Sequence, residues 1–460
     1  MTDERTLADL LARATELADD VQPPVADLLR RGRRRRSQRT GARAISVAAI
    51  AIIAVAAPQA VRTLDHHGQP PGPVALLPGL IPSGSPPAAS GPTGAQIAGF
   101  RWSELPSAPL HTTQPATVAW AGNELLALGG PVNGRPSPDG AAFEPATGRW
   151  HQIAPAPAGV KLGFATSVWT GSQFFVTDLR SSCQGSSQGK SPSACGPLAG
   201  LYDPATNRWS TTAVPRSLQD FGPMTATWTG SDVVLAGVSS HYRLKVAAYD
   251  PAANRWQLIT PTLPAGHSPA YATVAATARQ LIVWVMWQHT RSLHNGFSIR
   301  SGIDVFALSG NGTWRDMTGR WLQHQTMSTP TVTSSGLLVS PGEIWCGDYC
   351  SPPPAIDPGY FTRPDGWHRT DVPVSPVDAA FPAYIWTGDA IIEASGPITE
   401  HTTTGLSIRP ARLVVLDQAA SRWRTLPAPP TRFFFAAPPV WTGTELLLLT
   451  YHDHLYALRG

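Results

Sequence analysis

The sequence predicts an all-β protein in which a four-stranded unit repeats around a closed, seven-bladed β-propeller. Three observations carry this prediction: tryptophans recur at one spacing, a common turn precedes them, and a second strand-turn-strand pattern comes before each turn. The recurring tryptophans stand at positions 102, 150, 209, 256, 314, 367 and 423, with gaps of 48, 59, 47, 58, 53 and 56 residues. A period of about 50 residues is the scale on which propeller blades recur.

Each tryptophan closes a predicted hairpin between the third and fourth strands of a unit. Residues 143–150, 202–209 and 249–256 align without gaps: an aromatic residue stands seven positions before the tryptophan, followed by Asp or Glu, Pro and then Gly or Asn. Proline fixes φ, and Gly or Asn tolerates positive φ, which is what a tight turn requires. Residues 416–423 keep this spacing without the Pro and Gly. The units that end at Trp314 and Trp367 are more degenerate.

A second pattern precedes this hairpin and predicts the first two strands. It consists of a strand, a turn that contains Gly and a nearly continuous apolar run, at 118–126, 168–175, 227–234, 385–392 and 440–447; residues 275–282 and 332–338 lack its Trp. Such apolar runs are typical of strands covered on both faces. Twelve of the sixteen tryptophans thus occupy repeat positions, where we expect packing between blades rather than a ligand platform.

These motifs resemble the kelch type of β-propeller, the family that includes the propeller of galactose oxidase and sialate epimerases. The resemblance rests on Tyr-Asp-Pro-Ala-Thr-Asn-Arg-Trp at 202–209, on its close match at 249–256, and on Gly129-Gly130 after the strand 125–128; it covers roughly residues 100–460. The double Gly occurs once, and single Gly237 and Gly396 stand in other units. The chain is therefore a divergent relative, and its function must be argued from its own residues.

The resemblance raises two enzymatic alternatives. Likeness to galactose oxidase would imply copper held by Tyr and His, with one Tyr cross-linked to a Cys, and no Cys is spare if all four form disulfides. A sialidase-like hydrolase would need a cluster of Arg with a Tyr and an acid; Arg216, Arg432 and Asp220 are available, but no spacing singles them out. We expect no cofactor and no metal site.

The two ends of the repeat region predict how the ring closes. The last unit ends at Gly460 after a third strand, 455–458, with no closing tryptophan, while residues 100–106 contain a lone fourth strand with no blade before it. We expect this N-terminal strand to complete the last blade. Seven blades closed in this way leave no open sheet edge.

Residues 1–99 are expected to lie outside the propeller. Residues 1–43 form a basic cytoplasmic leader, 44–61 an apolar stretch, and 62–99 a stalk rich in Pro, Gly and Ser. A helix over 44–61 would be about 27 Å long against a hydrocarbon core of about 30 Å, and the long leader favours an uncleaved transmembrane signal anchor over a cleaved signal peptide. Since Arg and Lys stay on the cytoplasmic side, the propeller would be extracytoplasmic.

The net charge of +4 comes mostly from the leader. The leader holds ten Arg against seven Asp and Glu, which is +3, so the rest of the chain is nearly neutral. This balance argues against nucleic acid as a partner of the main domain. A chain this rich in Ala, Arg and Pro looks like an exported protein of a high-GC, actinobacterial kind of bacterium.

Four cysteines fit an exported domain. Cys183 and Cys195 bracket a Ser- and Gly-rich insertion, and Cys346 and Cys350 bracket three residues, so we predict two local disulfides, Cys183–Cys195 and Cys346–Cys350. Metal binding is the alternative for Cys-x3-Cys and for His452-Asp453-His454 in the last hairpin. No accompanying His or Cys cluster supports it, which favours disulfides and a polar turn.

The long insertions predict one recognition face. They occupy residues 131–141, 178–200, 286–302, 341–355 and 397–410, all between second and third strands, and we expect both disulfides on this face. The connections between blades emerge on the same face, and a polar residue recurs there before the first strand: His111, Lys161, Asp220, His267, Asp378 and Arg432, with Gln323 or His324 in the fifth unit. These are either ordinary polar loop residues or a convergent site for a polar or sugar-like ligand at the channel mouth.

The sequence favours a membrane-tethered binding or protein-interaction module, because a propeller on a stalk needs only a recognition face. Its partner would be an extracellular protein or a glycan. A carbohydrate-active enzyme and a surface structural protein are the alternatives.

Overall fold

The structure is a computed structural model that describes residues 91–460 with gaps. The gaps are residues 111, 113–116, 133–134, 161, 163–164, 179–197, 219–220, 240, 278–279, 294–295, 309–311, 319–330, 334–335, 340–359, 364–365, 370–382, 396–397, 403–404, 410, 418–421, 431–438 and 451–452. The predicted leader and membrane anchor and all four cysteines lie outside the described residues. Within the part of the chain that is described, no helix is both long enough and apolar enough to cross a membrane.

The described residues form seven four-stranded antiparallel sheets. The first three sheets consist of β2 (Thr117–Trp120), β3 (Leu125–Leu128), β6 (Gly140–Glu144) and β7 (Arg149–Gln152); β8 (Thr166–Trp169), β9 (Phe174–Thr177), β10 (Leu198–Asp203) and β11 (Arg208–Ala213); and β12 (Phe221–Trp228), β13 (Val233–Ser239), β14 (Leu244–Asp250) and β15 (Arg255–Leu258). The next two consist of β16 (Ser268–Ala276), β17 (Leu281–Leu293), β18 (Gly296–Leu308) and β19 (Trp314–Asp316); and β20 (Thr331–Thr333), β21 (Gly336–Val339), β22 (Tyr360–Arg363) and β23 (Gly366–Arg369). The last two consist of β24 (Ala383–Trp386), β25 (Ile391–Ser395), β28 (Arg412–Asp417) and β29 (Arg422–Thr425); and β30 (Val440–Trp441), β31 (Leu446–Leu449) and β32 (Leu455–Arg459) with β1 (Arg101–Leu105).

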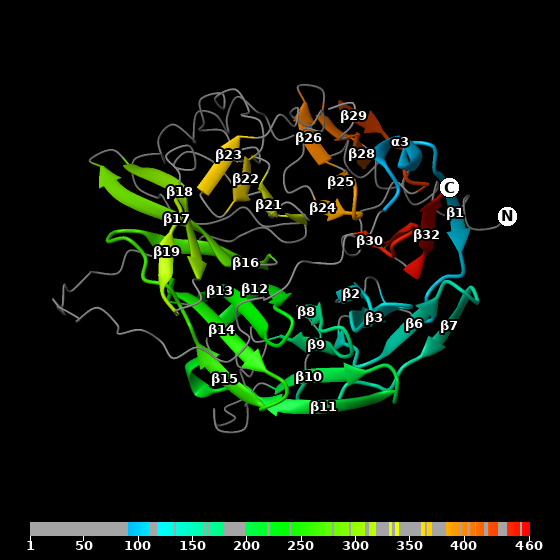
Figure 1. Cartoon of the computed structure of the whole chain (residues 1–460), viewed down its shortest axis with the longest axis horizontal. Helices are drawn as coiled ribbons and strands as arrows, with labels where there is room; N and C mark the ends of the chain where they lie inside the picture. The colour runs from blue at the N-terminus through cyan, green and yellow to red at the C-terminus, as the bar shows by residue number, and fades with distance from the viewer. Residues whose placement is uncertain are drawn as a thin grey trace, which may run out of the picture. The chain divides into compact units, whose positions relative to one another are not determined.

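The sheets stand around a ring with their first strands innermost (Figure 1). These first strands contact one another in turn, β2 with β8, β8 with β12 and on through β16, β20, β24 and β30, and β30 contacts β2 again. The predicted all-β propeller is therefore confirmed. The β20–β23 sheet is the smallest, with strands of three or four residues.

The N-terminal strand completes the last sheet, as the sequence predicted. β1 pairs antiparallel with β32, so that Arg101 lies opposite Arg459 and Leu105 opposite Leu455. Just before β1, the short helix α3 (Gly94–Ile97) begins at a capping box formed by Thr93 and Gln96, and its Ile97 is fully buried against the β24–β29 sheet. The folded unit thus includes residues 94–97, which the sequence assigned to the stalk.

Threonines fix the turn between the first and second strands. The hydroxyl oxygens of five of them accept a hydrogen bond from the backbone N–H three positions on, at 3.0 to 3.2 Å: Thr170, Thr229, Thr277, Thr387 and Thr442. The Gly that follows four of these has a φ between 91° and 108°, a conformation that disfavours side chains. The second strands β3, β9 and β31 are buried along their whole length, and since successive side chains point to opposite faces, these strands are covered on both, as predicted.

Tryptophans of the fourth strands connect five of the described sheets to the sheet before. The indole Nε1 donates a hydrogen bond across the interface, at 2.6 to 3.4 Å, in five pairs: Trp102 to Pro427 O, Trp150 to Pro106 O, Trp209 to Ala154 O, Trp256 to Thr212 Oγ1 and Trp314 to Ile259 O. The expected role of these tryptophans in packing between blades is confirmed.

The Asn-Arg-Trp sequence at 207–209 acts as a two-point clamp. Asn207 Oδ1 accepts a hydrogen bond from the Ala154 N–H at 2.7 Å, while Trp209 Nε1 donates to the Ala154 carbonyl at 2.7 Å. Tyr202 lies opposite Trp209 in the hairpin, with ring centroids 5.3 Å apart, and donates its hydroxyl to Asn207 Oδ1 at 3.0 Å. The motif therefore satisfies both polar groups of one residue on the preceding sheet.

The residue two positions before each of these tryptophans suits the hydrogen-bonding group that lies across the interface from that tryptophan. In the next sheet, Asn254 Oδ1 accepts a hydrogen bond from the Thr212 hydroxyl at 2.7 Å. Trp150 instead faces Pro106, which has no N–H to offer, and the position two before Trp150 is Gly148. Asn254 and Gly148 both have positive φ, as the predicted turn requires.

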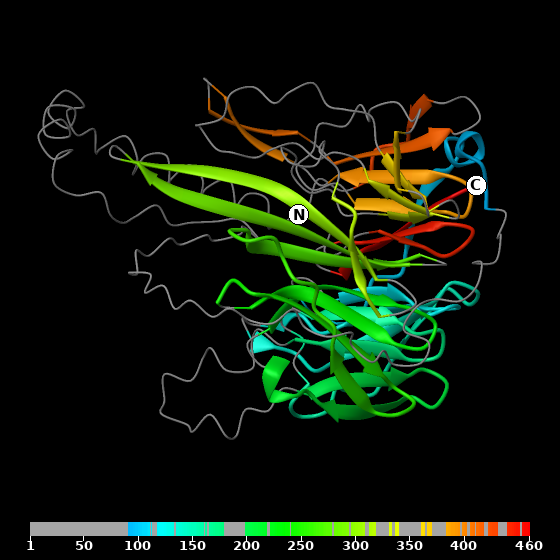
Figure 2. The same cartoon turned by 60° about the vertical axis from the view of Figure 1, so that its left-hand side comes forward.

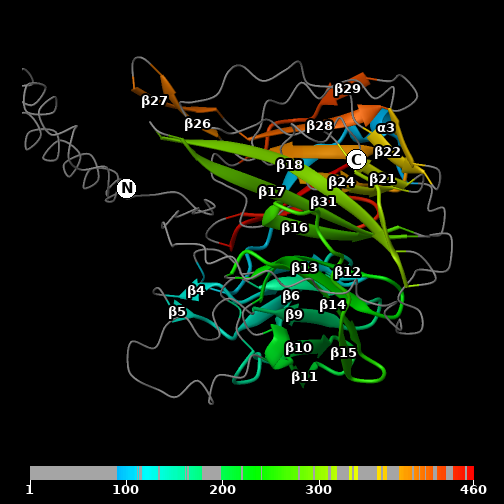
Figure 3. The same cartoon turned by 90° about the vertical axis from the view of Figure 1, so that its left-hand side faces the viewer.

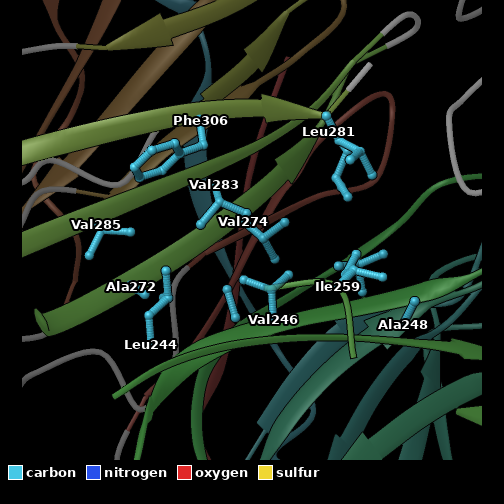
Figure 4. Close-up of a cluster of buried hydrophobic side chains, with 13 residues drawn as sticks. Leu244, Val246, Ala248, Ile259, Ala272, Val274, Leu281, Val283, Val285 and Phe306 are labelled. Carbon is cyan, nitrogen blue, oxygen red and sulfur yellow. The ribbon is translucent and has the colours of Figure 1, made fainter. Parts of the chain in front are cut away.

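A buried apolar cluster fills the interface between the β12–β15 and β16–β19 sheets (Figure 4). Leu244, Ala272 and Val285 lie together at one end of it, and Ile259 and Leu281 lie at the other.

Three long hairpins project from one face, each at a connection between second and third strands. They are β4–β5 (Pro131–Val132 and Arg135–Pro136), the ends of β17 and β18, and β26–β27 (Ile398–Thr402 and Gly405–Arg409). β17 and β18 continue for five register pairs beyond Gln288, the last residue of β17 that pairs with β16, and the hairpin extends well past its sheet (Figure 2). All three project to the same side (Figure 3), as predicted for these insertions. Residues 179–197 and 340–359, which hold most of the other two insertions and both cysteine pairs, lie outside the described part.

Candidate functional site

His267 is the predicted site residue that the structure describes. It ends the turn between β15 and β16, where its N–H donates to Pro264 O at 3.2 Å and Gly266 has a φ of 83°. His111, Lys161, Asp220, Asp378 and Arg432, together with Gln323 and His324, lie outside the described residues. Their predicted convergence at the channel mouth stays a prediction.

The imidazole of His267 is held by two residues of its own sheet. Its Nδ1 lies 2.8 Å from Asp304 Oδ2, and its ring stacks on Trp287 with centroids 3.8 Å apart and planes 18° apart. Trp287 also donates its side-chain hydrogen bond to Asp304. One carboxylate thus accepts from two stacked rings.

The register of the sheet explains how these residues meet. Pro269, two positions after His267, pairs with Trp287, and a β-bulge follows between Pro269 and Tyr271. Asp304 lies on β18 opposite Val285. Val285 and Trp287 are two positions apart on β17, so their side chains and that of Asp304 lie on the same face of the sheet. The turn before β16 therefore carries the imidazole over β17 and onto the carboxylate of β18.

Burial and hydrogen bonding act in opposite directions on the Asp304 carboxyl. The side chain of Asp304 is 3% exposed and that of His267 is 25% exposed. Desolvation raises the pKa of Asp304, while the hydrogen bond and charge of His267 and the hydrogen bond from Trp287 lower the pKa; Asp316 nearby raises it. Desolvation prevails, so the net shift of the pKa is upward.

Sequence reasoning found His267 but missed Asp304 and Trp287. The signal for Asp304 was a single charged residue inside the apolar run 303–308, which a buried strand tolerates only when the charge has partners. No sequence signal places Trp287 beside His267, because the pairing depends on the bulge in β16.

Of the His452-Asp453-His454 segment, the structure describes Asp453 and His454, and His452 lies outside the described residues. Asp453 has a φ of 65° in the turn between β31 and β32, is buried, and accepts hydrogen bonds from the Thr112 N–H and hydroxyl, both at 3.0 Å. This carboxylate ties the last sheet to the loop before β2.

No family model matches the chain, and the comparison with curated proteins gives no match. Among solved structures, the chain is similar to a novel fungal alcohol oxidase with catalytic diversity among the AA5 family, in complex with copper: the TM-score is 0.51 and the identity 12%, over 79% of this chain and 76% of that chain. At this identity the likeness concerns the fold alone. It supports the β-propeller fold.

The copper in that neighbour raises the question of a metal site here. Within the described ranges, no three side chains of His, Cys, Asp or Glu come together in a way that could hold a metal ion. His267 and Asp304 are two such groups, and Trp287, the third member of their cluster, is not a metal ligand. The residues of this cluster therefore do not fit copper.

Proposed function

We propose that this chain is a ligand-binding or protein-interaction module whose recognition face is the one that carries the long hairpins. The observation that carries the proposal is the common direction of the three hairpins (Figure 3). The connection that holds His267 lies between a fourth and a first strand, and such connections emerge at the same end of the blades. Rigid sheets that present variable loops on one side are a common basis of recognition.

The proposal includes the arrangement expected from the sequence. All seven sheets act as blades of one ring, residues 44–61 anchor the chain in the cell membrane with the N-terminus cytoplasmic, and the propeller is extracytoplasmic on its stalk. The pairs Cys183–Cys195 and Cys346–Cys350 form disulfides on the recognition face. Supporting this arrangement are the Arg-rich leader, the apolar stretch and the even number of cysteines.

A carbohydrate-active enzyme is the second candidate, and one observation favours it. A histidine held by a buried carboxylate is the arrangement that orients an imidazole for general base catalysis. Turnover of a carbohydrate by the full chain, lost in His267→Phe, would favour the enzyme over the binding module.

Hairpin trimming tests the recognition face. In the full chain, residues 289–300 of the β17–β18 hairpin are replaced by Asn-Gly between Gln288 and Ser301, which already pair across the strands. Binding is measured against cell-wall glycans and secreted proteins. We expect the trimmed chain to keep its melting temperature and to lose binding.

The matched control alters the other face. Thr206→Ala changes a turn between third and fourth strands, where Thr206 is hydrogen-bonded only to Asp203 among the described residues, and binding should be unchanged. Full binding by the trimmed chain, or equal loss in the control, would contradict the proposed face. Protease protection of the propeller in intact cells would contradict the extracytoplasmic location.

A further inference from the structure

We propose that His267 accepts a hydrogen bond from a hydroxyl group of a neutral carbohydrate, with Asp304 as the residue that positions the imidazole and Tyr242 as an aromatic contact. This inference rests on the proposed function, because it names the ligand class for the same face. It concerns the end of the interface between the β12–β15 and β16–β19 sheets.

The first step is the direction in which His267 offers its hydrogen bond. When the Asp304 carboxyl is ionised it can only accept, so its contact with His267 then places the imidazole proton on Nδ1. The lone pair of the neutral ring is then on Nε2, at the opposite edge. Among the described residues Nε2 has no partner, and the side chain is 25% exposed. With this tautomer, the ring has an acceptor nitrogen available to a donor of a ligand.

The second step is rigidity. His267 is stacked on Trp287 at 3.8 Å, and both rings share the Asp304 carboxylate. Neither the ring plane nor the tautomer is free to change without loss of one of these contacts. A ligand that binds Nε2 thus meets a group that is already ordered, which lowers the entropy lost on binding.

The third step is an exposed aromatic residue on the neighbouring sheet. Tyr242 stands in the turn between β13 and β14 with a φ of 55° and is 57% exposed. The other described non-glycine residues with positive φ are Asn or Asp, which tolerate it. Ser239 holds the turn, since its hydroxyl accepts from the His241 and Arg243 N–H groups at 3.3 and 3.2 Å. A strained, exposed aromatic side chain indicates a functional role.

The two features lie at the same end of the interface. Leu244, two residues after Tyr242, belongs to one buried cluster with Ala272 and Val285 (Figure 4). Trp287 is two residues beyond Val285 in the same direction, toward the projecting hairpins. Tyr242 and His267 therefore stand at the same end of this interface.

These groups together select the ligand class. An acceptor nitrogen needs a donor, which a sugar hydroxyl supplies and a carboxylate or phosphodiester group does not. The apolar C–H face of a sugar ring packs on an aromatic side chain that has one apolar and one polar end, as Tyr does. Peptides offer donors as well, so a peptide ligand is an outcome that the test must distinguish.

The test begins with the full chain on an array of neutral gluco-, galacto- and manno-oligosaccharides, followed by calorimetric titration of the best binder. His267→Phe keeps the stack on Trp287 and removes the acceptor; we expect about tenfold weaker binding, the value of one hydrogen bond in a site. Tyr242→Gly keeps the turn conformation and should also weaken binding. His151→Phe is the matched control, because His151 also contacts a buried carboxylate, Glu124 at 3.6 Å, but lies on a fourth strand; it should bind normally.

A double-mutant cycle with deoxy sugars identifies the hydrogen bond. Removal of the recognised hydroxyl should weaken binding to the natural chain and have no effect on His267→Phe, whereas a merely structural role would give additive losses. Because His267→Phe leaves the buried Asp304 short of a partner, the same cycle is run with Asp304→Asn added. Glycan binding with additive losses, or binding of secreted peptides and of no glycan, would overturn this inference and leave the proposed function standing. No binding of any probe would overturn both.

Discussion

The outer edges of the sheets and the rim that holds His267 use the same kinds of side chain for different purposes. At the outer edge, Asn207 and Trp209 form hydrogen bonds across the interface, where Ala154 donates its N–H to Asn207 Oδ1 and accepts at its carbonyl from Trp209 Nε1. At the rim, Trp287 and His267 turn toward Asp304 on their own sheet, and one ring nitrogen is left facing outward.

The difference separates residues that hold the ring together from residues that can bind. A side chain whose donors and acceptors are met inside the protein has less hydrogen-bonding capacity left for a ligand. A tryptophan hydrogen bond across the interface recurs in five of the described sheets, whereas the His267 cluster occurs once among them, at the sheet with the longest strands. The following substitutions test this separation in order of expected effect.

The largest effect is expected from Trp209→Ala. It removes the ring that packs on Tyr202 and the hydrogen bond to Ala154, so the free energy of unfolding should fall by about 3 to 4 kcal/mol. Trp209→Phe keeps most of the packing and should cost about 1 to 2 kcal/mol. Denaturant unfolding measures both. Glycan binding by the folded fraction should be unchanged in either variant, and a specific loss of binding would break the separation.

A smaller effect is expected at Asn207. Asn207→Ala loses the acceptor for Ala154 N–H and places a side chain without turn preference at a φ of 51°, which should cost about 2 kcal/mol. Asn207→Gly tolerates the φ and should cost about 1 kcal/mol from the lost hydrogen bonds alone. Equal losses in the two variants would show that the backbone conformation contributes nothing.

The smallest effect concerns a buried carboxylate without a histidine. Asp232 is fully buried, its Oδ2 accepts from Ser231, and desolvation raises its pKa. The folded state therefore holds the proton more tightly than the unfolded state, and this contribution to stability is present below the usual pKa of Asp and lost as the pH rises through the raised pKa. Asp232→Asn should gain stability relative to the natural chain over that pH range. A stability difference that stays constant with pH would contradict the assignment.

Much of the fold followed from the sequence because the repeat is local. In three units, the Pro and the Gly or Asn before the Trp specify the turn between the third and fourth strands. In four units, a Thr-Gly pair specifies the turn between the first and second strands. The choice between Gly148 and Asn207 could not be predicted, since it depends on whether Pro106 or Ala154 lies across the interface, and that is set by how the sheets pack.

Less of the candidate site could be predicted. His267 stood out as a polar residue among Pro, Ala and Gly, but its partners lie 20 and 37 positions away along the chain. They meet it only because a bulge in β16 and the register of β17 with β18 bring three strands together. A sequence pattern predicts the spacing of residues within one hairpin, but it does not predict which loop residue lies against the third strand of the sheet.

The tautomer of His267 tests the central claim most directly. In the full chain labelled with ¹⁵N at histidine, long-range proton–nitrogen correlations at about pH 8 distinguish the protonated from the unprotonated ring nitrogen. The signals of His267 are assigned by their absence in His267→Phe. The account predicts a proton on Nδ1 and a bare Nε2, with a mixture of tautomers in Asp304→Asn. A proton on Nε2 in the natural chain would contradict it, because the outward-facing nitrogen would then donate a hydrogen bond rather than accept one.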